Sequence, residues 1–90
     1  MFEILEQLMK TIRERKSSSQ DSSYTNKLLK DKNLSKEKVL EEIGELIQSV
    51  EQNSNKIHEA ADVFYHLIIY LESNNIKIED IMLELKKRKK

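Results

Sequence analysis

Four carboxylates in this chain fall into two pairs with helical spacing. Glu42 and Glu45 are three residues apart, and so are Glu59 and Asp62. Residues i and i+3 share one face of a helix, so each pair directs two acidic side chains the same way. Thirteen residues separate Glu45 from Glu59, enough for a turn that would bring the two pairs together.

This grouping of carboxylates predicts a site for a divalent cation. At an effective dielectric constant of about 20, like charges about 6 Å apart repel by roughly 3 kcal/mol per pair. A hard metal ion compensates that repulsion, because Mg²⁺ and Mn²⁺ prefer carboxylate oxygen and also bridge to phosphate. We therefore expect Mg²⁺, with Mn²⁺ as a possible substitute, held by Glu42, Glu45, Glu59 and Asp62.

The competing interpretation is a solvated acidic face. For Glu41, Glu42 and Glu45 taken alone that interpretation is favoured, and Lys38 could simply pair with Glu42 at i+4. Asp62 reverses the preference, because it lies amid apolar residues where an idle carboxylate would be costly to bury.

Composition narrows the class of protein. Ninety residues suit one small domain, expected to span residues 1–90. Lys plus Arg and Asp plus Glu each total sixteen, which gives no reason to expect binding to nucleic acid or to a membrane. The absence of Cys excludes disulfides, thiolate zinc sites and a cysteine nucleophile. The charged N-terminal stretch is neither a signal peptide nor a membrane span, so we expect a cytoplasmic protein.

The apolar pattern predicts an all-α fold, a small helical bundle with two long antiparallel helices. There is one Gly and no Pro, and apolar residues recur with a period near 3.6. The expected elements are an apolar helical stripe from Phe2 to Ile12, a mobile polar loop over Lys16–Ser23, a short helix over Tyr24–Lys30, a long helix from the N-cap Ser35 to about Glu51, a turn over Gln52–Asn55, a second long helix over Lys56–Glu72, a turn over Ser73–Asn75 and a last helix over Ile78–Lys87.

The two long helices carry more apolar surface than one small domain normally covers. The expected apolar positions are Val39, Leu40, Ile43, Leu46, Ile47 and Val50 on the first helix, and Ile57, Ala60, Phe64, Leu67, Ile68 and Leu71 on the second. A helix that is apolar around most of its circumference packs on more than one side. We therefore expect a homodimer whose bundle is completed by both chains.

Several segments resemble a known family. EEIGEL at Glu41–Leu46 and EAAD at Glu59–Asp62 resemble the ExxE and ExxD motifs of the all-α nucleotide pyrophosphohydrolase superfamily, which includes MazG-type enzymes. SSYTNKLL at Ser22–Leu29, EAADVFYHL at Glu59–Leu67 and IKIEDIMLELKKR at Ile76–Arg88 resemble, more narrowly, the phosphoribosyl-ATP pyrophosphohydrolases.

The resemblance implies Mg²⁺-dependent hydrolysis of phosphoribosyl-ATP to phosphoribosyl-AMP and pyrophosphate, the second step of histidine biosynthesis. Carboxylate-held Mg²⁺ suits this reaction, because it neutralises phosphate oxygens and activates water. It also implies a possible association with phosphoribosyl-AMP cyclohydrolase. The implied catalytic residues are Glu41, Glu42 and Glu45, and the implied substrate-binding residues are Ser23, Tyr24, Thr25, Lys27, Tyr65 and His66.

Alternatives stay open for single residues and for the whole chain. Tyr24 could only pack, His66 is more often a satisfied interface histidine than a ligand, and His58 is expected at the surface. Arg13, Arg15 and Lys16 could reach a phosphate when the polar loop closes. A second enzymatic interpretation keeps the metal but takes a dNTP or related nucleotide as substrate. A nonenzymatic interpretation is a dimeric helical interaction module with solvated acidic faces.

Overall fold

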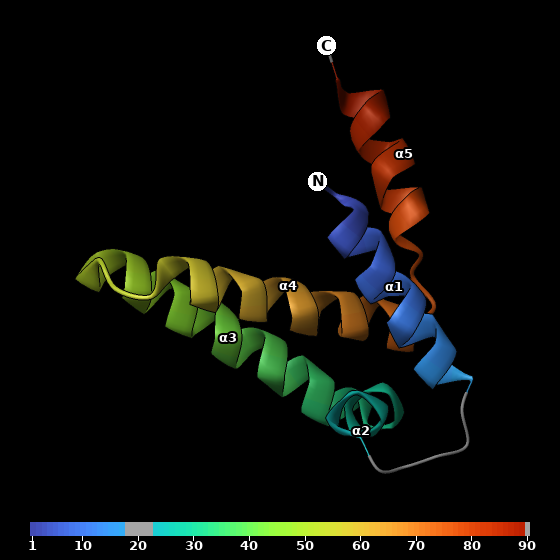
Figure 1. Cartoon of the computed structure of the whole chain (residues 1–90), viewed down its shortest axis with the longest axis horizontal. Coiled ribbons are helices and arrows are strands. Elements are labelled where there is room, and N and C mark those ends of the chain that lie inside the picture. Colours follow the sequence, from blue (N-terminus) through green and yellow to red (C-terminus); the bar gives the residue numbers. More distant parts are fainter. Residues whose placement is uncertain (18–22, 90) are drawn as a thin grey trace.

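The computed structural model describes residues 1–17 and 23–89, and these residues form helices and no strand (Figure 1). The prediction of an all-α fold is therefore confirmed. The helices are α1 (Glu3–Lys16), α2 (Tyr24–Lys30), α3 (Lys32–Gln52), α4 (Lys56–Ser73) and α5 (Ile78–Arg88). The loop predicted over residues 16–23 falls largely on residues 18–22, which lie outside the described residues. No helix in the described ranges is both long and apolar enough to cross a membrane.

The long helices α3 and α4 form an antiparallel hairpin (Figure 1). Asn53 and Asn55 in the connecting turn have φ values of 53° and 52°. Asn tolerates this left-handed conformation better than most residues. The turn also satisfies the end of α3, because the backbone N–H of Ser54 donates to the carbonyl of Ser49 at 2.9 Å. The turn predicted over residues 52–55 is thus confirmed in place, but it is one residue shorter because Gln52 still belongs to α3.

The start of α3 differs from the prediction. Ser35 was expected as the N-cap, but the helix begins at Lys32. Asp31 is the N-cap, and its Oδ1 accepts a hydrogen bond from the backbone N–H of Leu34 at 3.0 Å. Ser35 is instead buried one turn inside the helix. Asp and Ser are comparable caps, so the choice depends on where α2 ends and not on residue type alone.

The core lies where α1, α2 and α4 meet. Ile12, Leu28, Ile68 and Ile69 are its buried members, and Leu28 and Ile69 have no exposed surface. Amphipathic helices form such a core by turning one apolar stripe inward. The core therefore packs α1 and the short helix α2 against the same part of α4, at the end of the hairpin away from its turn.

Within the hairpin, the inner face of α3 is made of small and acidic residues. Ser35, Val39 and Ser49 are buried there, and Glu42 is half-buried. Much of the predicted apolar surface faces outward instead. We call these exposed side chains the hairpin face; its members are Leu40, Ile43, Ile47 and Val50 of α3 and Ile57, Phe64 and Leu67 of α4.

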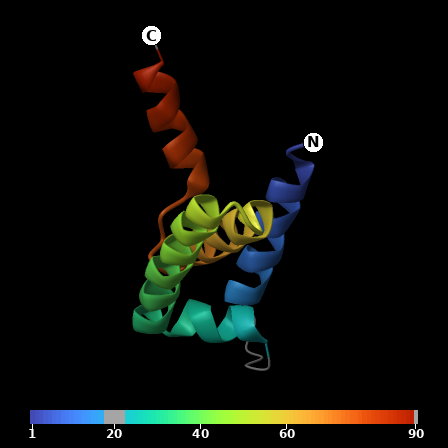
Figure 2. The ribbon, with the colours of Figure 1, turned by 90° about the vertical axis from the view of Figure 1, so that its left-hand side faces the viewer.

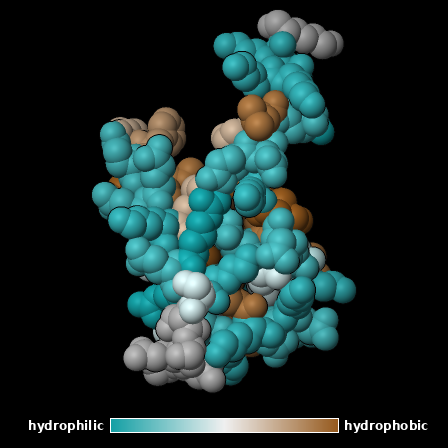
Figure 3. Space-filling model, turned by 90° about the vertical axis from the view of Figure 1, so that its right-hand side faces the viewer, coloured by the Kyte–Doolittle hydropathy of each residue, from teal (hydrophilic) through white to brown (hydrophobic). Residues whose placement is uncertain are grey.

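One copy of the chain is more open than a compact domain of this size. Its radius of gyration is 14.2 Å, whereas about 12 Å is expected for 90 residues. The α3–α4 hairpin projects away from the other helices, and both termini lie at the top of the view, at the free ends of α1 and α5 (Figure 1). Figure 2 shows α1 and α5 diverging on one side of the hairpin. The hollow between them is lined by apolar side chains, including Leu5, Met9 and Ile78 (Figure 3).

Helix α5 has no buried residue within its described length. Its first turn is held by hydrogen bonds from an arginine of α1. Arg13 donates from Nη1 and Nη2 to the two carboxylate oxygens of Glu79, at 2.8 and 2.6 Å. Its Nε donates to Glu72 of α4 at 3.1 Å. The hydrogen bonds from Arg13 lower the pKa of Glu79 to about 2 and raise the pKa of Arg13. One guanidinium thus joins α1, α4 and α5.

We predict that acid releases α5 before the other helices. The ordinary pKa of Glu79 is 4.5 and its pKa in the folded chain is about 2. A depressed carboxyl pKa contributes stability above the ordinary value, and this contribution is lost as pH falls toward the folded value. Amide exchange in α5 should therefore accelerate, relative to α3, between about pH 4.5 and 2. The effect should be small, because the pair is partly exposed.

Glu79→Gln is the control for this prediction. The amide cannot titrate, so α5 should already exchange faster at neutral pH and should lose its acid dependence. An α5 whose exchange in the parent protein follows that of α3 at every pH would contradict the anchoring role of Arg13.

Candidate active site

The hairpin brings the two acidic pairs together. One carboxylate oxygen each from Glu42, Glu45 and Glu59 lies within 4.8 Å of the others. A second group with the same spacing contains His58, Glu59 and Asp62. Because Glu59 belongs to both groups, all four predicted carboxylates form one continuous cluster across α3 and α4. Metal binding by the cluster stays a prediction.

Two oxygens of this cluster are buried without a hydrogen-bond partner among the described residues. They are Oε2 of Glu42 and Oε2 of Glu59, one from each side of the hairpin. A buried polar atom without a partner carries a desolvation cost of about 1–3 kcal/mol, and more when it is charged. Burial, together with the neighbouring Glu45, raises the pKa of Glu42. A cation between these oxygens would remove both penalties.

Glu41 lies beside the cluster rather than in it. Its exposed carboxylate pairs with Lys38 at 3.3 Å, and that hydrogen bond raises the pKa of Lys38. The pairing of Lys38 with Glu42, which the competing interpretation of a solvated acidic face allowed, is not the one found. The lysine is taken by Glu41, and Glu42 keeps an unpartnered oxygen.

His58 is a member of the site that sequence reasoning missed. It is exposed, as expected, but its Nε2 lies 3.4 Å from Oδ2 of Asp62. The available signal was its i, i+4 spacing from Asp62 on one helix. A histidine nitrogen is a common metal ligand, so His58 is a further candidate at the exposed edge of the cluster.

Helix α2 begins next to the cluster, and its first residues are hydrogen-bonded. Ser23 caps the helix, since its Oγ accepts from the backbone N–H of Asn26 at 3.0 Å. Tyr24 OH lies 3.0 Å from Nε2 of His66. Burial raises the pKa of Tyr24, and Glu42 is near enough to contribute to that rise. Thr25 Oγ1 forms a short hydrogen bond with Tyr65 OH. Ser22, the first residue of the SSYTNKLL segment, lies outside the described residues.

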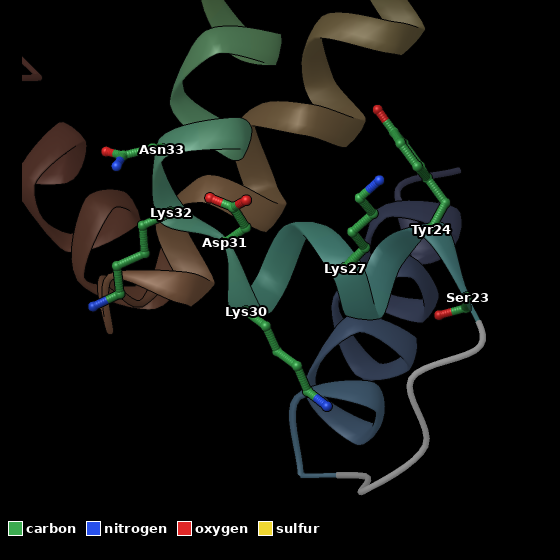
Figure 4. A pocket seen from close by; sticks show the side chains of 7 residues that line it. All are labelled: Ser23, Tyr24, Lys27, Lys30, Asp31, Lys32 and Asn33. Atoms are coloured by element: carbon green, nitrogen blue, oxygen red, sulfur yellow. The ribbon is translucent and has the colours of Figure 1, made fainter.

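Lys27 is exposed on the side of α2 that also carries Tyr24. Figure 4 shows both side chains pointing the same way, whereas Lys30 points in the opposite direction. An open pocket of about 790 Å³ adjoins them, and its lining also includes Asp31 and Lys32. The ammonium of Lys27 is thus accessible to an anionic ligand near Tyr24.

His66 is buried and both of its ring nitrogens are engaged. Nδ1 lies 2.8 Å from the backbone carbonyl oxygen of Asp62, and Nε2 faces Tyr24 OH. Its ring also meets the edge of Tyr65, with centroids 5.1 Å apart. The interpretation of His66 as a satisfied interface histidine is therefore the one its surroundings support.

The basic residues expected near phosphate at the end of α1 are partly engaged elsewhere. Arg13 is held by Glu72 and Glu79, and Lys16 Nζ donates to Oδ1 of Asn75 at 2.8 Å. These partners could not be predicted from the sequence, because Glu72 and Asn75 each lie 59 residues along the chain from the residue they contact. In this arrangement the guanidinium of Arg13 is held by two carboxylates, whereas the exposed ammonium of Lys16 makes one hydrogen bond.

An all-α domain that gathers carboxylates from two antiparallel helices matches the arrangement expected of the all-α nucleotide pyrophosphohydrolases. Comparison with known proteins narrows this class. The chain belongs to the phosphoribosyl-ATP pyrophosphohydrolase family, whose sequence model matches residues 5–89.

Individual relatives agree with the family match. The chain is 39% identical to the phosphoribosyl-ATP pyrophosphatase of Bacillus mycoides, over 98% of this chain and 85% of that protein. It is 43% identical to the phosphoribosyl-ATP pyrophosphatase of Bacillus cereus strain B4264, over 90% and 78%. It is also 37% identical to the histidine biosynthesis bifunctional protein HisIE of Pyrococcus furiosus, over 97% of this chain and 42% of that protein. The predicted family is thus confirmed.

Proposed function

We propose that this chain hydrolyses phosphoribosyl-ATP to phosphoribosyl-AMP and pyrophosphate, as the second step of histidine biosynthesis. The family match and the names of the relatives support the substrate. The observation that supports the chemistry is the pair of buried, unpartnered oxygens of Glu42 and Glu59, two residues of one carboxylate cluster. Pyrophosphate release from phosphoribosyl-ATP, followed with and without Mg²⁺, tests the proposal.

The residues of the cluster fit a hard divalent cation. Glu42, Glu45, Glu59 and Asp62 would hold Mg²⁺, or Mn²⁺ in its place, because all four offer carboxylate oxygen. When bound, such an ion neutralises charge on the polyphosphate and lowers the pKa of a coordinated water. His58 would orient the carboxylate of Asp62 through the 3.4 Å contact between its Nε2 and Oδ2 of Asp62.

Two roles remain, acceptance of a proton from water and binding of a phosphate oxygen, and we assign them to exposed side chains. Glu45 would offer one carboxylate oxygen to the cation, and because it is exposed its second oxygen stays accessible to an attacking water and can accept its proton. Glu41 is the outer candidate for the same role, and its contact with Lys38 fixes its position. Lys27 would hold a phosphate oxygen by a charge-assisted hydrogen bond.

We predict that Lys27→Ala lowers kcat/KM on phosphoribosyl-ATP by about ten- to a hundredfold. A lost hydrogen bond to a charged group is worth about 1.5–3 kcal/mol. Mg²⁺ affinity should change little, because the carboxylate cluster is untouched. Steady-state kinetics and calorimetric Mg²⁺ titration measure the two quantities. Lys36→Ala is the matched control, since Lys36 is an exposed lysine of α3 outside the lining of this pocket. An unchanged kcat/KM in Lys27→Ala would contradict phosphate binding by Lys27 and leave the SYTNKLL segment with a packing role only.

We also propose that two copies associate through the hairpin face. Phe64 is 60% exposed and Ile57 is 88% exposed, and both belong to that apolar surface. An apolar patch of this kind on a free monomer marks an interaction site. A second hairpin packed on it would complete a helical bundle of the kind expected from the sequence.

Phosphoribosyl-AMP cyclohydrolase is the proposed downstream partner. The Pyrococcus furiosus relative is a bifunctional histidine biosynthesis protein, and this chain matches 42% of its length. A second activity in the same polypeptide supports a physical link between consecutive steps of the pathway.

A further inference from the structure

Two neighbouring side-chain hydrogen bonds join α2 to α4. Tyr24 of α2 bonds to His66 of α4, and the next residue, Thr25, bonds to the preceding one, Tyr65. We call these four residues the α2 clamp. Beneath them Leu28 is fully buried in the core. The clamp therefore fixes the start of α2, and the core fixes its middle.

The bond directions in the clamp follow from the chemistry of His66. The backbone carbonyl of Asp62 can only accept, so the neutral ring carries its proton on Nδ1 and donates it there. Nε2 is then an acceptor, and Tyr24 OH donates to it at 3.0 Å. A continuous chain of hydrogen bonds thus runs from Tyr24 through His66 to the backbone of Asp62, a member of the acidic cluster.

Helix α2 needs such support because it has only seven residues. Isolated helices shorter than about 12–15 residues are marginal in water. Lys27 follows Tyr24 by three residues, so the two share a face of α2. Any rotation of α2 that breaks the Tyr24–His66 bond would therefore also move the ammonium of Lys27 relative to the cluster.

We propose that the α2 clamp is a positioning device that sets the place of Lys27 relative to the carboxylate cluster. The proposal rests on the proposed function. It assigns Tyr24, Thr25, Tyr65 and His66 to positioning, where the resemblance implies direct contact with substrate. His66 is 6% exposed and bonded at both nitrogens, which fits this assignment. The clamp residues then act through Lys27, and removing Lys27 removes their effect.

A double-mutant cycle between Tyr24→Phe and Lys27→Ala tests this proposal. Tyr24→Phe keeps the ring and deletes the hydroxyl, and loss of one hydrogen bond should lower kcat/KM on phosphoribosyl-ATP by about two- to tenfold. In the Lys27→Ala background the same change should have less than about a twofold effect. Equal fold losses in the two backgrounds would overturn the proposal, because Tyr24 would then act independently of Lys27.

Amide exchange and Mn²⁺ binding provide readouts that need no substrate. Tyr24→Phe and Tyr65→Phe should accelerate exchange in α2 relative to α3, with Mn²⁺ affinity unchanged. Tyr70→Phe is the matched control, since the hydroxyl of this α4 residue enters none of the hydrogen bonds found among the described residues. Unchanged α2 exchange in an active enzyme would overturn the clamp alone. A parent protein without turnover on phosphoribosyl-ATP would overturn the proposed function and the positioning role with it, whatever the exchange shows.

Discussion

Glu42→Gln and Asp62→Asn should each lower Mg²⁺-dependent turnover of phosphoribosyl-ATP by about a hundredfold or more. An amide keeps the size of the side chain but loses the charge that holds a hard cation. A bound metal contributes several kcal/mol to such reactions, and each 1.36 kcal/mol is a factor of ten in rate. Turnover should be measured over a range of Mg²⁺ concentrations, so that weakened binding is separated from lost chemistry.

The matched control for the carboxylate variants is Glu51→Gln. Glu51 is an exposed glutamate of α3 outside the acidic cluster, so its replacement should leave turnover unchanged. Near-normal activity in Glu42→Gln or Asp62→Asn at every Mg²⁺ concentration would remove that residue from the site.

Melting in EDTA separates a metal-binding role for Glu42 from a structural one. Without metal, Glu42→Gln should be as stable as the parent or slightly more stable, by up to about 0.5 kcal/mol, because it removes repulsion from a like charge one turn away. A clear loss of stability would instead indicate that Glu42 is paired in the apo protein.

Phe64→Glu should convert the proposed dimer to a folded monomer. In a single chain Phe64 is 60% exposed, so a charge there should leave the helical fold intact. In a symmetric dimer the change occurs twice, and loss of two buried aromatic side chains costs about 3–6 kcal/mol. The dissociation constant should therefore rise by about a hundredfold or more.

Light scattering and circular dichroism of both proteins at micromolar concentration measure this effect. Phe2→Glu is the matched control, because Phe2 is 78% exposed but lies outside the hairpin face. A parent protein that is a stable, fully helical monomer under these conditions would contradict the proposed dimer.

The helices could be predicted from the sequence because local signals mark most of them. The bounds of α2, Tyr24–Lys30, match the prediction, and α4 starts at Lys56 and α5 at Ile78 as predicted. The start of α3 was missed because its first turn has one apolar residue, Leu34, which defines no periodic stripe. The N-cap is Asp31, the single residue between the end of α2 at Lys30 and the start of α3 at Lys32.

The meeting of the acidic pairs could also be predicted, since i, i+3 spacing and the length of the connection determine it. The partners of individual side chains could not. Glu41 and Glu42 both lie within reach of Lys38 on the same helix, so the sequence does not determine its partner. In the structure Lys38 pairs with Glu41. The contacts of Arg13 with α4 and α5 and of Tyr24 with His66 join residues 42 or more positions apart, so they depend on how the helices pack.

The most direct test of the proposed function is a pyrophosphate-release assay of the purified protein with phosphoribosyl-ATP and, in parallel, with a panel of dNTPs. Each substrate is measured with and without Mg²⁺. We predict Mg²⁺-dependent release from phosphoribosyl-ATP with a higher kcat/KM than for any dNTP. A preference for a dNTP would assign the chain the broader nucleotide pyrophosphohydrolase activity, and no release from any substrate in the presence of Mg²⁺ would contradict an enzymatic role for the acidic cluster.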